Sequence, residues 1–284
     1  MGKASKVKVE VTEVRDLVDL IQVLKDVADM KYHALISQRV KFNRFNESFM
    51  EFFSLVGYSQ VRHPLVINDN PRTAIVVIST ERSFVGDLNT RVVTRALEEL
   101  EKTPGAVLVM VGKKGAAKLE ALGQKSAKVW EDIEERGFYE VAVEIKNYLV
   151  KEVMEGRLGK VVLVYPWPKD YTVIKPRVVK LLPSEDLLPK QRQSIEKFKQ
   201  VIEESDPIDM IGYLADLWLS AKVFEIFYDT NLAAASAQTQ QLDNSLGKMR
   251  KERDVVKLKY RKARRGDIDK SLREVFSARM MVTK

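Results

Sequence analysis

Apolar residues recur at alternating steps of three and four over two long stretches, one at each end of the chain. Near the C-terminus, eight of ten such positions are apolar: Leu232, Ala235, Thr239, Leu242, Leu246, Met249, Arg253, Val256, Tyr260 and Ala263. Near the N-terminus, eleven of thirteen are apolar: Val14, Leu17, Ile21, Leu24, Ala28, Lys31, Leu35, Gln38, Phe42, Phe45, Phe49, Phe52 and Val56. Because a 3.5-residue repeat keeps one stripe facing a partner helix, both stretches predict coiled-coil helices.

Both predicted helices are unusually long. No proline follows Pro207, and neither proline nor glycine lies between Ser5 and Gly57. At 1.5 Å per residue, about 70 residues span about 100 Å, and about 45 residues span about 65–70 Å. An ordinary amphipathic helix on a globular core is the alternative, but a typical helix has only about 11–12 residues. We therefore expect the two ends to pair with each other.

The direction of this pairing follows from the connection between the helices. The intervening residues would link both helices from one end, which favours an antiparallel coiled coil. After Gly266 the apolar pattern resumes with a shifted phase at Ile268, Leu272, Val275 and Phe276. This shift predicts that the C-terminal helix outruns its partner there and continues alone.

The middle of the chain alternates strand and helix patterns. Continuous apolar runs at 73–80, 106–111 and 160–165 predict buried strands, and 172–182 predicts a longer, more exposed one. Helices are expected at 88–102, from 113 to about 122, at 138–155 and at 185–205, with a minor strand near Val129. This alternation predicts a Rossmann-like α/β domain. The expected organisation is a coiled-coil helix at 1–58, an α/β domain at 59–205 and a coiled-coil helix at 206–284.

The net charge of +8 comes from one segment. Residues 248–279 contain thirteen Lys or Arg and five acidic residues, so the rest of the chain is balanced at 35 of each sign. A one-sided excess on one helix predicts an anionic partner, such as nucleic acid, lipid headgroups or an acidic protein surface. A solvated helix face is the alternative.

Catalytic patterns are missing from the sequence. The segment Gly112–Gly115 follows a predicted strand, but it lacks the spacing and the Lys-Ser/Thr pair of a phosphate-binding loop. There is no cysteine, and the two histidines, His33 and His63, are thirty residues apart, so we expect no metal site and no catalytic triad. No signal peptide and no membrane span are expected either. The sequence favours a non-enzymatic protein without a cofactor.

Several segments together resemble the gamma subunit of F-type ATP synthases. Residues 76–89, VVISTERSFVGDLN, are similar to the signature strand and turn of that family, and residues 110–115 to its second strand, which ends in G-x-K-G. Residues 155–160 (EGRLGK), 181–183 (LLP) and 260–275 resemble further family segments in the same order and spacing. Two terminal heptad helices bracket these segments, and the resemblance covers essentially the full chain.

The resemblance implies a central-stalk rotor that couples nucleotide turnover in a ring of alpha and beta subunits to rotation, and usually to ion translocation. It implies an epsilon-type subunit and a membrane rotor ring as further partners. It also implies that the protein is cytoplasmic and is bound to the inner face of the cell membrane through the complex. The expected ring contacts are a basic collar and an apolar row beyond it. The basic collar is Lys257, Lys259, Arg261, Lys262, Arg264 and Arg265, and the apolar row is Ile268, Leu272 and Phe276. The turn at residues 80–89 is expected to be structural.

Two other functions remain open at this point. One is the gamma-like shaft of a specialised rotary ATPase that does not make ATP. The other is a nucleic-acid-binding coiled-coil protein, which the basic cluster favours. In a basic zipper, however, the basic region precedes the heptads, whereas here it lies within and after them.

Overall fold

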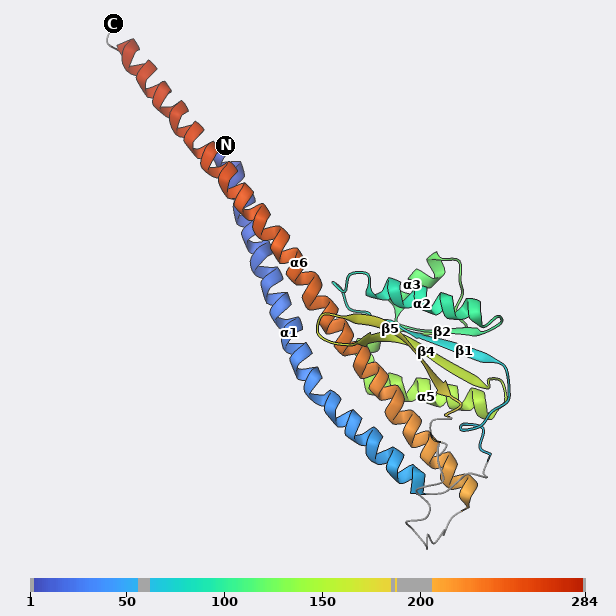
Figure 1. Ribbon diagram of the computed structural model, residues 1–284. Coiled ribbons are helices and arrows are strands. Elements are labelled where there is room, and N and C mark those ends of the chain that lie inside the picture. The colour runs from blue at the N-terminus through green and yellow to red at the C-terminus, as the bar shows by residue number, and fades with distance from the viewer. Residues whose placement is uncertain (1–2, 56–61, 185–186, 188–205, 283–284) are drawn as a thin grey trace. The chain divides into compact units, whose positions relative to one another are not determined.

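The computed structural model describes residues 3–55, 62–184, 187 and 206–282, and it divides into two compact units (Figure 1). Unit 1 contains residues 3–29 and 238–282, and unit 2 contains the described residues from 30 to 237. Two helices, α1 (Lys3–Leu55) and α6 (Pro207–Val282), contribute to both units. Each unit is described by itself below.

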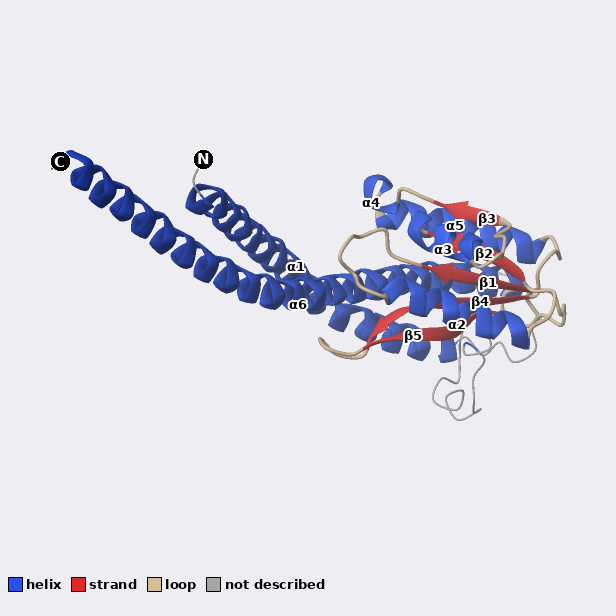
Figure 2. Ribbon diagram, turned by 90° about the horizontal axis from the view of Figure 1, so that it is seen from above, coloured by secondary structure: helices blue, strands red, loops and turns tan. Residues whose placement is uncertain are grey.

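Unit 2 is built on a five-stranded mixed sheet in the order β3-β2-β1-β4-β5 (Figure 2). The strands are β1 (Thr73–Ile78), β2 (Val107–Val111), β3 (Lys128–Trp130), β4 (Lys160–Pro168) and β5 (Ile174–Leu182). The first four are parallel, and β5 pairs antiparallel with β4 as an edge strand. All six residues of β1 are buried, as expected for a central parallel strand covered on both faces.

Helices cover both faces of this sheet. One face packs against α2 (Leu88–Lys102) and α3 (Lys113–Ala121), which lie together in Figure 1. The opposite face packs against α5 (Phe138–Met154) and against the first turns of α6, whose buried residues there run from Ile211 to Phe227. Alternate residues of β1 point to the two cores, with Ile75 on one side and Val76 on the other.

The structure confirms the predicted α/β class. The four longer strands, the minor strand and the helices at 88–102, 113–122 and 138–155 all form within a few residues of their expected ends. The sequence did not predict the short helix α4 (Ile133–Arg136). The helix expected at 185–205 lies outside the described residues, apart from Leu187, which is buried in the core.

α6 begins where the sequence places a helix start. Asp206 accepts a hydrogen bond from the backbone N–H of Ile208 at 2.8 Å, which satisfies one of the free donors of the first turn. Pro207 follows as the first helical residue, where its missing N–H costs nothing.

Within unit 2, α1 and α6 run antiparallel. Asn46 donates a hydrogen bond to Glu225 at 2.9 Å, and the hydroxyl of Tyr228 donates to the backbone oxygen of Leu35 at 2.8 Å. The ring of Phe42 lies 5.2 Å from that of Tyr228. Residue numbers thus rise along one helix as they fall along the other, which confirms the predicted antiparallel pairing in this unit.

Unit 1 shows the same antiparallel arrangement. Lys25 forms an ion pair with Asp243, and Arg250 donates to the side-chain oxygen of Gln22 at 3.0 Å. At the far end, the backbone N–H of Ala4 donates to Asp267 at 3.0 Å. All ten predicted α6 positions from 232 to 263 are buried or half-buried, so the C-terminal heptad prediction is confirmed.

The heptad prediction for α1 is confirmed at seven of the ten positions whose burial is described and is wrong at Leu17, Lys31 and Phe45, which are exposed. Predicted positions such as Val14, Ala28 and Phe49 are buried and Leu24 is half-buried, but at the three exposed positions the next residue along the chain is the buried or half-buried one. Leu17 and Phe45 are exposed at 47% and 40%, whereas Val18 is buried. The observed stripe instead uses the half-buried Lys25, Arg39 and Asn46, because acidic residues of α6 pair with each of them. A count of apolar residues alone misses polar positions that are paired.

The glycine at the start of α3 is required by close packing. A Cβ added at Gly115 would lie 2.4 Å from Oγ and 2.6 Å from Cβ of Ser79, at the end of β1. Gly115→Ala is therefore expected to lower the free energy of unfolding by about 1–3 kcal/mol through overpacking. Gly247→Ala is the matched control on α6, since a Cβ there meets nothing within 4 Å. It should raise stability by about 0.5–1 kcal/mol. Urea unfolding of both variants measures the difference, and equal effects would contradict the packing argument.

Candidate functional site

The part of α6 just beyond Asp267 is exposed to solvent. The described residues from 268 to 279 are all exposed, and the apolar row is exposed at 50% for Ile268, 51% for Leu272 and 64% for Phe276. Immediately before this part, the backbone N–H of Ala4 near the start of α1 donates to Asp267 of α6. The helix therefore continues beyond its partner just after Gly266, as the phase shift predicts, and presents apolar side chains to solvent.

The basic collar lies immediately before this exposed end. All six of its side chains are exposed, and none forms an ion pair within the described part of the chain. The neighbouring pairs involve other residues, Arg253 with Asp254 and Lys270 with Glu274. The positive charge of the collar is thus not neutralised by an ion pair among the described residues.

The collar residues do not all share one face. Steps of four, three, four, four and three place six residues on a single stripe: Lys257, Arg261, Arg264, Ile268, Leu272 and Val275. An open hollow of about 350 Å³ runs along part of this stripe and is lined by Arg264, Asp267, Ile268, Ser271, Leu272 and Val275. Lys259 and Lys262 fall outside these steps and point to other sides, whereas Arg265 precedes Ile268 by three and Leu272 by seven residues and so borders the stripe. Collar residues thus continue along one face into Ile268 and Leu272 of the apolar row, and Val275 extends this face.

The turn at residues 80–89 is held together from within. Asn89 accepts a hydrogen bond from the backbone N–H of Thr80 at 3.0 Å and donates to the backbone oxygen of Thr80 at 2.7 Å. Val85 and Leu88 pack against Ala233 and Ala234 of α6. These contacts fix the turn to the helix and give it a structural role.

The glycine-rich segment 112–115 holds no free anion position. The carboxylate of Glu81 accepts hydrogen bonds from the backbone N–H groups of Lys113, Asp132 and Ile133, at 2.9–3.1 Å. These donors belong to the N-terminal ends of α3 and α4, where a helix stabilises negative charge. An internal carboxylate therefore fills the place that a phosphate would need. The sequence analysis missed Glu81 because its partners lie more than thirty residues away.

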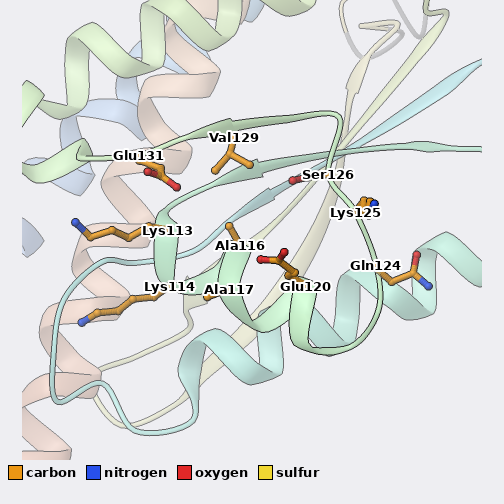
Figure 3. A pocket seen from close by; sticks show the side chains of 10 residues that line it. All are labelled: Lys113, Lys114, Ala116, Ala117, Glu120, Gln124, Lys125, Ser126, Val129 and Glu131. Atoms are coloured by element: carbon orange, nitrogen blue, oxygen red, sulfur yellow. The ribbon is translucent and has the colours of Figure 1, made fainter.

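A hollow of about 690 Å³ lies beside this segment, between α3 and β3 (Figure 3). Its ten lining residues mix both signs of charge, with Lys113, Lys114, Lys125, Glu120 and Glu131 among them. Lys113 pairs with Asp132 at 3.1 Å, and Lys114 donates to Ser83 at 3.1 Å. Two of its lysines are therefore already engaged by the turn and by α4.

Comparison with known proteins identifies the family. The chain is 26% identical to the ATP synthase gamma chain of Pelotomaculum thermopropionicum over 222 residues, which cover 78% of this chain and 77% of that one. The ATP synthase family matches residues 3–280. The chain belongs to the ATP synthase gamma chain family. The gamma chain of Opitutus terrae is 20% identical over 98% of both chains, so this member is divergent.

Solved structures share the fold. A chain of the Euglena gracilis mitochondrial ATP synthase, from a structure of OSCP/F1/c-ring in rotational state 3, aligns with a TM-score of 0.66 at 16% identity. That alignment covers 99% of this gamma chain and 94% of the other. A chain from the central stalk and c-ring of the Tetrahymena thermophila enzyme aligns with a TM-score of 0.59 at 17% identity, over 80% and 99%.

The family membership decides the functional class. This gamma chain is a rotor subunit of the ATP synthase central stalk and is not a catalytic subunit. The nucleic-acid alternative is therefore wrong. No helix among the described residues is long and apolar enough to cross a membrane.

Proposed function

We propose that this gamma chain turns inside a ring of alpha- and beta-type subunits, with the exposed end of α6 as the part that the ring surrounds. The observation that carries the proposal is the stripe from Lys257 to Val275, on which cations that form no ion pair with other described residues adjoin solvent-exposed apolar side chains. Charged and apolar groups left uncompensated on one surface are typical of a protein interface.

The proposed partners of the remaining chain follow from the family. An epsilon-type subunit and a membrane rotor ring would bind the α/β body, and the protein would lie at the inner face of the cell membrane as a peripheral part of the complex. The same surface would suit a specialised rotary ATPase that does not make ATP. Copurification of alpha- and beta-type chains with this protein supports the proposal, and copurification of nucleic acid without them contradicts it.

Two matched charge variants test the stripe. Replacing Arg261 and Arg264 by glutamine removes two collar cations on the stripe, and replacing Lys259 and Lys262 removes two from other faces. Each exposed charge contributes about 0.2–1 kcal/mol. The stripe variant is therefore expected to lose about tenfold in binding to the ring. ATP-driven ion pumping should fall with it, and replacing all six collar residues together should impair coupling most. Equal losses from the two double variants would contradict the role of the stripe.

A further inference from the structure

One arginine within unit 2 joins three elements that are far apart in the sequence. Arg39 of α1 lies 3.3 Å from the carboxylate of Asp229 of α6, measured from its Nε atom. Its Nη1 donates to the backbone oxygen of Pro168 at the end of β4, at 2.9 Å. Its guanidinium lies 5.7 Å from the centre of the Trp167 ring. Arg39 thus connects both long helices to the hairpin formed by β4 and β5.

Asp229 is buried at the centre of this cluster, with only 3% of its surface exposed. Arg177 of β5 faces it from the hairpin, stacked 5.0 Å from the centre of the Trp167 ring, and Tyr165 of β4 lies nearby. On α6 the neighbouring charges are Lys222 and Glu225, which pair with each other at 2.9 Å. Tyr32 of α1 lies within electrostatic reach of both Arg39 and Asp170 of the hairpin. The charged groups around the carboxylate therefore come from α1, α6 and the hairpin.

This environment is costly for an ionised carboxylate. Burial raises the pKa of Asp229 to about 6, although Arg39, and more weakly Arg177 and Lys222, oppose the rise. Burial also raises the pKa of Tyr165. Replacing a buried ion pair with apolar residues is often neutral or stabilising, so packing alone does not call for one here. The planar guanidinium of Arg39 contacts Asp229 through Nε and Pro168 through Nη1, and two such directed contacts fix its orientation in a way that an apolar contact does not.

We propose that Arg39 and Asp229 are a positioning pair that fixes α1 and α6 to the β4–β5 hairpin. This joint carries torque between the two helices and the sheet. The inference rests on the rotor role of the gamma chain but not on the ring contacts of the stripe. The hairpin tip supports the joint, because Tyr171 packs edge-on against Tyr32 and its backbone oxygen accepts a hydrogen bond from Ser236.

The pair gives a pH dependence whose sign is fixed. The pKa of Asp229 is about 6 in the folded chain, above the ordinary value of 3.8, so the folded state binds the proton more tightly. The stability that protonation adds is fully present below the unfolded pKa and is lost as pH rises through about 6. Relative to Asp229→Asn, the folding equilibrium constant of the wild-type full chain should rise about tenfold from pH 7 to pH 5.

That comparison is made by urea unfolding of the two full-length chains at each pH. Because the amide is nearly isosteric with the carboxylic acid, the variant keeps the packing and removes only the titration. If the difference in unfolding free energy between the two chains does not change with pH, the inference that Asp229 is an ionisable carboxylate buried in the pair is wrong. This test uses no ring subunit, so it stands apart from any failure of the stripe.

The torque role is tested in the assembled complex with Arg39→Gln. Arg91→Gln is the matched control, since Arg91 also contacts an aspartate, Asp87 at 3.0 Å, and a hairpin carbonyl, that of Ile174 at 2.9 Å, but lies on α2. We expect Arg39→Gln to lower the number of ions pumped per ATP hydrolysed by about twofold or more while hydrolysis continues. Arg91→Gln should leave that ratio unchanged.

Two outcomes would overturn the torque role. One is a pumping ratio for Arg39→Gln equal to that of Arg91→Gln. The other applies if the Arg39→Gln chain does not assemble into the complex. The complex is then made with Asp229→Asn, and a ratio of ions pumped per ATP at pH 7 equal to that of the wild type would contradict the torque role. A lowered ratio in that complex supports it, since the amide cannot replace the charge that orients Arg39.

Discussion

Val256→Asp should separate the two helices of unit 1. Val256 is 2% exposed on the stripe of α6 that faces α1. Burying a carboxylate there without a partner costs several kcal/mol, and about 1.5–3 kcal/mol of apolar burial is lost as well. Unit 1 contains only the two helices, so no other core offsets this loss.

The adjacent residue provides the control. Val255 has the same side chain but is 54% exposed, so Val255→Asp should leave the pairing intact. Hydrogen exchange of the full-length chains measures the outcome residue by residue. In Val256→Asp, residues 3–29 and 238–267 should lose protection while β1 keeps it. Equal protection in the two variants would contradict the assigned stripe.

The strands and their helices could be predicted because their signals are local. A run such as 73–78 is apolar at every position, which is the pattern of a strand buried on both faces. The heptads of α6 are equally local, since their positions are apolar or small and repeat over many turns. The end of the pairing between α1 and α6 near Gly266 could also be predicted from the sequence, because an unpaired helix has no partner that requires its apolar residues to keep the heptad spacing.

The polar contacts could not be predicted in the same way. In the sequence alone, a charged residue such as Arg39 argues against a buried helix position. Only its partner Asp229, 190 residues away, explains why Arg39 is half-buried. Glu81 likewise gives no sign in the sequence that it caps α3 and α4. The apolar pattern from Ile211 to Phe227 did contain a usable signal. Its buried positions form a broader stripe than a heptad seam, which is typical of a helix on a globular core.

Phe227→Ala tests that second role of α6. Phe227 is 1% exposed and lies in the core shared by the sheet, α5 and α6. Truncating a fully buried phenylalanine removes its apolar burial and leaves a cavity, so the free energy of unfolding should fall by about 3–5 kcal/mol. Thermal and urea unfolding of the full chain measure this loss.

Phe276→Ala is the matched control on the same helix. Its ring is 64% exposed, so its removal should change the stability of the isolated chain by less than about 0.5 kcal/mol. The same variant should weaken binding to the ring, where the apolar row is proposed to make contact. One helix would thus have a fold-determining end and a partner-binding end. A loss of stability from Phe276→Ala as large as that from Phe227→Ala would contradict this division.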